Sequence, residues 1–270
     1  MTGLMRPIRL HSESFGDGEP LVIAHGLFGS GTNWRTLARR FAEQYHVVLL
    51  DARNHGRSPH CSTMSYAEMA ADLSCTLDGL GLSRVHLIGH SMGGKAAMTL
   101  ATTNPDRVRS LVVADVAPIA YDHDFDTELH AMKAIDAPSV ERRRDADERL
   151  SKHLQDPLLR AFLLQNLVQT DGKFSWRVNL AAIEAGVDVL TGSFVLERPY
   201  EGPALFLRGA NSQYVPDSAH DAIKTHFPRA QMLTIENAGH WLHAEQPDAF
   251  VDAATRFLSK HIVADADKSA

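Results

Sequence analysis

Short apolar runs alternate with stretches of helical spacing over roughly the first 116 residues. The runs are rich in Val, Leu and Ile and are bounded by turn residues, a pattern typical of strands buried on both faces of a parallel sheet. They read LVIAHG, HVVLLD, RVHLIGHS and LVVAD, preceded by an early edge strand, IRLHSESFG. Helical spacing lies between them at Trp34–Tyr45, Ser65–Leu80 and Gly94–Asn104. This order predicts an α/β fold with a doubly wound, mostly parallel sheet.

The pattern changes between residues 117 and 200. No strong strand run appears there, and helices are predicted at Thr127–Ile135, Ser139–Gln155 and Pro157–Gln169. Strands resume with ALFLRG and QMLTIE, and a helix over Pro247–Lys260 closes the chain. Because the block is much longer than a normal crossover, we interpret residues 117–200 as an inserted helical cap. The core domain then comprises residues 1–116 and 201–270; alternatively, the helices belong to the sheet layers.

Composition and charge indicate which partners and which cellular compartment the protein is expected to have. The chain has 270 residues, of which 44% are hydrophobic, and a net charge of -6. This charge disfavours a nucleic-acid or anionic-membrane partner, because no broad basic face is supplied. The stretch MTGLMRPIRL does not match a secretory signal as it stands, and no apolar run is long enough to span a bilayer; a targeting segment lost from a processed precursor is the alternative. Two cysteines, Cys61 and Cys75, are too few for a disulfide framework, so we expect a cytoplasmic protein.

One pentapeptide carries a candidate nucleophile. Residues 89–93 read GHSMG, which matches G-x-S-x-G, and they stand between the apolar run Val85–Ile88 and a helical pattern. A serine on such a strand-to-helix turn is held above the sheet in a strained backbone, which glycines on either side permit. We therefore predict Ser91 as the nucleophile. A structural serine in a tight turn is the alternative.

The same segment also fits part of a phosphate-binding loop. Gly89, Gly94 and Lys95 satisfy G-x-x-x-x-G-K, but the next residue, Ala96, replaces the Ser or Thr that should hold Mg²⁺. The loop would also follow two earlier strands. A nucleotide site is therefore disfavoured.

A base is needed because a serine hydroxyl is a poor nucleophile until its proton is removed. His240 follows the last predicted strand in the stretch NAGHW, where Gly239 lets the loop bring an imidazole over the sheet edge. A loop histidine without a role is the alternative. His243 and Glu245 stand nearby, but two ligands at this spacing without a third make a metal site a poor reading, and we expect surface residues and no metal.

The acid that orients the histidine is displaced. In this fold it commonly follows the strand ALFLRG as G-x-x-D, yet the fourth residue of this stretch is Ser212. Asp217 comes five residues later, which is late for the loop. Asp115 ends the strand right after the nucleophile's helix, and active sites of open α/β sheets gather at the carboxyl ends of strands. We predict Asp115 as the acid, with Asp217 as the alternative and a turn-capping role as the structural reading.

Two backbone N–H groups are candidates for an oxyanion hole. The glycine-rich stretch HGLFGS follows the strand LVIAH and can aim the N–H of Leu27 at a substrate oxygen, and Met92 offers another at the start of a helix. Phe28 is a possible substitute for Leu27, and a loop packed under the site is the modest reading. We expect Phe28, His90 and Trp241 to contact the substrate.

Two charged segments have mainly structural interpretations. The stretch DARNHGRS follows the strand HVVLLD, and we expect Asp51 and Arg53 to pair or to hold backbone groups near the nucleophile loop, rather than to contact substrate. Arg142–Arg144 stand among acidic neighbours, so a solvated helix face is the simpler reading. A basic cap face that meets the phosphates of a CoA leaving group is the alternative.

With HGLFGS, GHSMGGK, the Ser212 departure and AGHW in view, the chain resembles the α/β-hydrolase superfamily over nearly its full length. It is most similar to the YbfF-like bacterial esterases, a resemblance that DARNHGRS and DVAP strengthen. In that group the acid is displaced in the same way, so the resemblance implies a triad of Ser91, Asp115 and His240. It also implies esterase or acyl-CoA thioesterase activity, with no metal and no organic cofactor.

The predicted function is hydrolysis of a small acyl ester or thioester in two acyl-transfer steps. The cap's apolar residues as a group are expected to form the acyl pocket, although core packing is the better interpretation for any single one of them: Phe162, Leu163, Leu167, Phe174 and Trp176. Other chemistry on the same machinery, such as perhydrolysis or carbon–carbon bond cleavage, stays open, as does a slow-turnover receptor for a small ligand. A haloalkane dehalogenase is disfavoured, because it needs Asp in place of Ser91.

Overall fold

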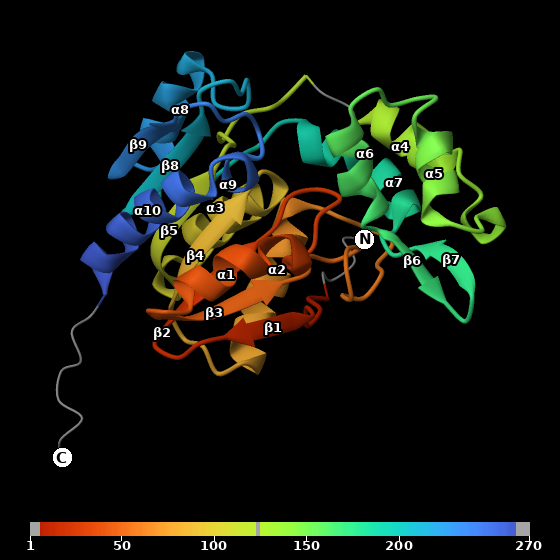
Figure 1. Cartoon of the computed structure of the whole chain (residues 1–270). Helices are drawn as coiled ribbons and strands as arrows, with labels where there is room; N and C mark the ends of the chain where they lie inside the picture. Colours follow the sequence, from red (N-terminus) through yellow and green to blue (C-terminus); the bar gives the residue numbers. More distant parts are fainter. Residues whose placement is uncertain (1–5, 123–124, 263–270) are drawn as a thin grey trace, which may run out of the picture.

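The computed structural model describes residues 6–122 and 125–262 (Figure 1). Within them, seven strands form one sheet in the order β1-β3-β2-β4-β5-β8-β9. Strand β1 pairs antiparallel with β3, and the other neighbouring pairs are parallel. The strands are β1 (Ser12–Phe15), β2 (Glu19–Ala24), β3 (Tyr45–Leu50), β4 (Val85–His90), β5 (Val108–Ala114), β8 (Ala204–Gly209) and β9 (Ala230–Ile235). The predicted doubly wound, mostly parallel sheet is confirmed.

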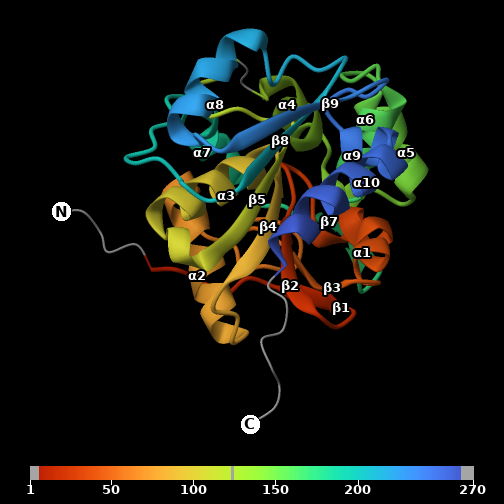
Figure 2. The same ribbon diagram turned by 90° about the vertical axis from the view of Figure 1, so that its left-hand side faces the viewer.

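Helices cover both faces of this sheet (Figure 2). Side chains alternate between faces along a strand, so in β5 Leu111 and Val113 join one core while Val112 and Ala114 join the other. The first core packs against α2 (Tyr66–Gly79), α3 (Met92–Thr103) and α8 (His220–His226), and the second against α1 (Arg35–Phe41) and α10 (Pro247–Leu258). Of the helices described, none is long and apolar enough to cross a membrane.

Residues 117–200, here called the cap segment, stand beside one end of the sheet (Figure 1). They form α4 (Asp126–Lys133), α5 (Arg143–Leu150), α6 (Pro157–Leu164), β6 (Leu167–Thr170), β7 (Lys173–Trp176) and α7 (Leu180–Thr191). Strands β6 and β7 pair as an antiparallel hairpin, so the predicted helix over Pro157–Gln169 is too long. Its turn, Asp171-Gly172, has positive φ at both residues. Asp-Gly is a strong hairpin signal, which the sequence prediction overlooked.

Candidate active site

Ser91 lies on the sharp turn between β4 and α3, in the rarely populated conformation φ 51°, ψ -119°. Its N–H donates to the carbonyl of Ala114 at 3.0 Å, which ties the turn to strand β5. A Cβ atom on Gly89 would lie 2.4 Å from the carbonyl oxygen of Gly93, so the close approach of strand and helix requires glycine there. Such strain costs about 1–3 kcal/mol and persists because the surroundings over-determine it.

A chain of hydrogen bonds links Ser91 to His240 and Asp115. The Nε2 atom of His240 lies 3.1 Å from Oγ of Ser91, and its Nδ1 lies 2.8 Å from Oδ2 of Asp115. Asp115 is fully buried and also accepts the N–H of Gly209 at 2.9 Å and the hydroxyl of Ser212. The structure therefore brings together the three residues predicted from β4, β5 and the loop after β9.

Asp217, the alternative acid, makes its contacts outside the hydrogen-bond chain of Ser91, His240 and Asp115. The side chain of Asp217 is 83% exposed and pairs with Arg208 at 2.7 Å. Ser212, which occupies the position where the acid was expected, donates its hydroxyl to Asp115 instead. That hydroxyl also accepts the N–H of Tyr214, whose ring stacks on His240 at 3.8 Å. The loop after β8 thus supplies a donor and an aromatic support rather than a carboxylate.

The loop after β2 runs directly against the nucleophile. It turns at Gly26–Gly29, where the N–H of Gly29 donates to the carbonyl of Gly26 at 3.0 Å, and a Cβ atom on Gly26 would lie 3.2 Å from Cβ of Ser91. The N–H of Phe28 donates to Nε2 of His55, so it cannot serve the hole. Among the residues described, neither the Leu27 N–H nor the Met92 N–H has an acceptor. These two groups are therefore free to bind an oxyanion.

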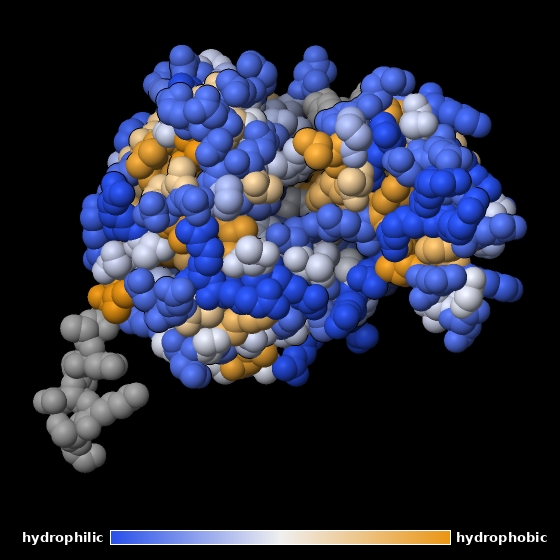
Figure 3. Space-filling view, in the orientation of Figure 1, coloured by the Kyte–Doolittle hydropathy of each residue, from blue (hydrophilic) through white to orange (hydrophobic). Residues whose placement is uncertain are grey.

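A pocket of about 260 Å³ opens in front of Ser91, slightly below the usual size range for small-ligand sites. Figure 3 shows the hollow between the core and the cap segment, with apolar surface on the side of α6. The lining includes all three predicted substrate contacts, together with apolar residues of the cap segment: Phe28, His90, Trp241, Phe125, Leu159 and Phe162. The ring of Phe162 lies 5.6 Å from that of Trp241.

The other residues predicted for the acyl pocket lie elsewhere. Leu163, Leu167 and Phe174 are buried in the interior of the cap segment, and Trp176 packs against the same core. For these four residues the structure therefore shows core packing, the preferred interpretation of each taken singly, and not a place in the pocket. Phe162 alone of the five lines the pocket.

Two buried histidines lie behind His240. His90 donates from Nε2 to the backbone carbonyl of His240 at 2.9 Å, and His243 stacks on Trp34 with ring centroids 4.2 Å apart. Burial lowers the pKa of His90 well below its ordinary value and that of His243 to about 3, so both are neutral near pH 7. The prediction of His243 as a surface residue is wrong, because its partner Trp34 comes from a distant segment.

Glu245, the other residue predicted at the surface, binds the backbone of the loop that carries His240. Its carboxylate accepts the N–H groups of Gly239 at 2.7 Å and Trp241 at 3.2 Å, on either side of His240. It therefore holds the loop that carries the imidazole. Within the described residues, no group of three or more His, Cys, Asp or Glu side chains could hold a metal ion.

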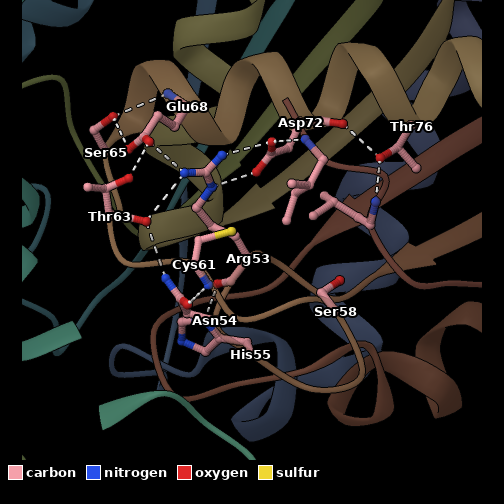
Figure 4. A network of polar contacts seen from close by, with 12 residues as sticks. Arg53, Asn54, His55, Ser58, Cys61, Thr63, Ser65, Glu68, Asp72 and Thr76 are labelled. Carbon is pink, nitrogen blue, oxygen red and sulfur yellow. Dashed lines mark hydrogen bonds and ion pairs between the residues drawn. The ribbon is translucent and has the colours of Figure 1, made fainter. Parts of the chain in front are cut away.

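The loop after β3 is anchored by a buried ionic network (Figure 4). Arg53 binds Asp72 through two hydrogen bonds of 2.6 and 2.9 Å and Glu68 at 2.7 Å. Asp51 instead accepts the N–H groups of Gly31 and Arg57, both at 2.7 Å. Of the two expected roles, Asp51 and Arg53 do not pair with each other, and both hold backbone groups, Arg53 through the carbonyl of Thr63 at 3.3 Å.

The three consecutive arginines of the cap segment, Arg142–Arg144, all bind other groups of the protein. Arg142 pairs with Asp145 at 3.0 Å and Arg144 with Glu148 at 3.3 Å. Arg143 donates to the carbonyls of Leu164 and Leu167. Exposed, paired side chains at Arg142 and Arg144 fit the expected solvated helix face, and a basic face for CoA phosphates stays an untested alternative.

Lys95, the lysine of the rival phosphate motif, is 1% exposed. Its Nζ donates to the carbonyl of Ile119 at 2.7 Å and lies 4.6–5.4 Å from three aromatic ring centroids, those of Tyr66, Tyr121 and Phe194. Burial lowers its pKa to about 8. Lys95 thus contacts both ends of the cap segment, at Ile119 and Phe194, and its ammonium group is engaged there rather than with a phosphate.

A nucleophile turn on a mostly parallel sheet, with a histidine after the last strand, defines an α/β-hydrolase. Residues 19–247 match the family described as alpha/beta hydrolase fold, and the chain belongs to this family. The resemblance inferred from the motifs is thereby confirmed.

Similar proteins carry ester-hydrolase names. The chain is 43% identical to the sn-1-specific diacylglycerol lipase ABHD11 of Mus musculus, over 94% of this chain and 87% of the relative. It is 37% identical to esterase YbfF of Escherichia coli (strain K12), over 90% and 94%. A solved structure titled marine microorganism esterase superimposes with a TM-score of 0.91 at 40% identity, covering 93% of this chain and 99% of that one.

Proposed function

We propose that this carboxylic ester hydrolase cleaves small acyl esters through an acyl-enzyme on Ser91. The observation that carries the proposal is the continuous hydrogen-bond chain from Ser91 through His240 to the buried Asp115, facing an apolar pocket. The esterase and lipase names of its relatives support the same bond type. Free cysteines at Cys61 and Cys75 support a cytoplasmic location.

In the first step His240 takes the proton of Ser91 through Nε2, and the serine oxygen attacks the ester carbonyl. The N–H groups of Leu27 and Met92 stabilise the oxyanion, and each such donor is typically worth about 3–4 kcal/mol. Asp115 holds the imidazole in the tautomer with a proton on Nδ1 and stabilises its charged form. His240 then protonates the leaving alcohol.

In the second step water takes the place of the serine. His240 accepts a proton from the water, which attacks the acyl carbonyl, and the proton returns to Ser91 as the carboxylic acid leaves. The apolar lining supplied by Phe125, Leu159 and Phe162 favours a hydrocarbon acyl chain over a charged one. A thioester can follow the same route with a thiol as leaving group, and we include it in the proposal.

Labelling with a fluorophosphonate tests this proposal directly. The wild type should label at Ser91 and hydrolyse p-nitrophenyl butyrate, whereas Ser91→Ala should fail to label and lose about 10⁶-fold in kcat. Ser151→Ala, which changes a serine on the cap segment with only a local hydrogen bond, serves as the matched control and should behave as wild type. A folded wild type that neither labels nor turns over esters would overturn the proposal.

A further inference from the structure

We propose that Asn166 of the cap segment and His55 of the core are positioning residues that fix the oxyanion loop by holding Phe28 between them. The inference rests on the proposed function, because it assigns the Leu27 N–H to the oxyanion hole. It adds a link between the cap segment and the chemistry: the same element that shapes the pocket also sets the donor geometry.

The backbone of Phe28 is strained. Its φ is 59°, in the left-handed region that costs a residue with a side chain about 1–2 kcal/mol. Phe28 is the third residue of the Gly26–Gly29 turn, where a positive φ ordinarily calls for glycine. The side chain contributes contacts that glycine would lose, because its ring packs edge-on against Phe125 at 6.3 Å. Something outside the turn must therefore hold this conformation.

Both polar backbone groups of Phe28 are held by buried side chains. Its N–H donates to Nε2 of His55 at 3.1 Å, and its carbonyl accepts from Nδ2 of Asn166 at 2.7 Å. His55 is 0% exposed and Asn166 is 4% exposed, so water competes little for either bond. A residue held through the peptide groups on both of its sides cannot relax to negative φ without leaving a buried group unpaired, which costs about 1–3 kcal/mol.

His55 is itself fixed as an acceptor. Its Nδ1–H donates to the carbonyl of Arg53 at 2.9 Å, which leaves Nε2 unprotonated toward Phe28. Burial lowers the pKa of His55 to about 3, so the ring stays neutral through the physiological range. The side chain of Arg53 is anchored by Asp72 (Figure 4), which helps to fix the residue whose carbonyl the imidazole contacts.

The cap segment reaches the loop by two routes. Asn166 lies between α6 and β6 and contacts the Phe28 carbonyl directly. Asn179, at the start of α7, donates its N–H to the carbonyl of Asn54 at 2.9 Å and its side-chain amide to Oδ1 of Asn54 at 3.1 Å. Asn54 precedes His55, so both side chains that hold Phe28 are tied to the cap segment. Displacement of that segment would therefore loosen the oxyanion loop.

Asn166→Leu keeps the side-chain volume and removes the donor to Phe28. We expect kcat for p-nitrophenyl butyrate to fall about 10-fold, the equivalent of one buried hydrogen bond, with KM within about 2-fold of wild type. Affinity for a trifluoromethyl ketone, whose adduct with Ser91 carries an oxyanion, should fall by the same factor. His60→Ala removes a different contact between core and cap segment, its 2.8 Å bond to the Arg177 carbonyl, and should leave both values unchanged.

The variant Asn166→Asp provides a second test, in which kcat is measured as a function of pH. A carboxylate cannot donate to the Phe28 carbonyl, whereas a protonated carboxyl can. The ratio of its kcat to that of wild type should therefore be low at pH 8 and rise as the pH falls through the pKa of the new carboxyl. If Asn166→Leu does not fold, this profile decides the question alone.

A ratio that does not change with pH would overturn the inference. So would wild-type kcat and ketone affinity in a folded Asn166→Leu, or a change confined to KM. All three outcomes presuppose an active wild type that labels at Ser91. An inactive wild type would instead overturn the proposed function.

Discussion

The two walls of the active site are built by different means. The core wall carries the polar chemistry: Ser91, His240 and Asp115 follow packed strands and are joined by hydrogen bonds of 3.1 and 2.8 Å, the second to a fully buried carboxylate. The cap wall is mainly apolar: α6 contributes Leu159 and Phe162, which can contact a substrate without directed bonds, and Glu128 of α4 is its charged member. Changes in the core wall should slow every substrate alike, whereas changes in the cap wall should re-rank substrates by acyl chain.

The largest test of this contrast is Asp115→Asn. The amide can hold His240 only in the wrong tautomer, so kcat should fall about 10⁴-fold for short and long esters equally. Asp217→Asn is the matched control, because that carboxylate is exposed and pairs with Arg208, and it should retain wild-type turnover. The reverse result, an inactive Asp217→Asn beside an active Asp115→Asn, would move the acid to the other loop.

A smaller loss is expected for Ser212→Ala. Its hydroxyl donates to the buried Asp115 carboxylate, and a hydrogen bond to a charged group is worth about 1.5–3 kcal/mol, so kcat should drop roughly 10-fold or somewhat more. Ser212→Thr keeps the hydroxyl and should recover most of the rate. Equal rates for Ser212→Ala and wild type would mean that Ser212 merely fills the space of the usual acid.

The smallest effect on kcat, and the sharpest on substrate ranking, is expected at Phe162. Phe162→Ala removes apolar contact worth about 0.8 kcal/mol per buried methylene of the acyl chain. The ratio kcat/KM for octanoate esters should fall about 10-fold relative to acetate esters. Leu158→Ala changes a residue on the same helix that is 74% exposed and outside the pocket lining, so it should leave the ranking intact. An equal loss for acetate and octanoate with Phe162→Ala would contradict the division between the walls.

The core wall could be predicted from sequence because its signals are local. A buried strand, a glycine-flanked serine and a helix are consecutive in the chain, and the ends of neighbouring parallel strands necessarily meet at one edge of the sheet. This reasoning favoured Asp115 over the more usual loop, and the structure places its carboxylate 2.8 Å from Nδ1 of His240.

The cap wall could be predicted only in outline. Its length indicated an inserted segment, but which apolar side chains turn inward depends on packing, and four of the five named for the pocket pack in the core. The hydrogen bond from Asn166 to the carbonyl of Phe28 joins residues 138 positions apart, and no short sequence motif marks such a contact. The stacking of His243 on Trp34 was missed for the same reason.

The order of the strands in the sheet also has a consequence for the local unfolding of the active site. Ser91 and Asp115 end the neighbouring interior strands β4 and β5, whereas His240 follows β9, which has a neighbour on one side only. Local opening draws on the least protected elements, so an edge strand exchanges its amide hydrogens before interior strands do. On warming, the enzyme would lose its base while the nucleophile and the acid kept their places. Heat inactivation would then begin as a reversible opening at one edge, ahead of global unfolding.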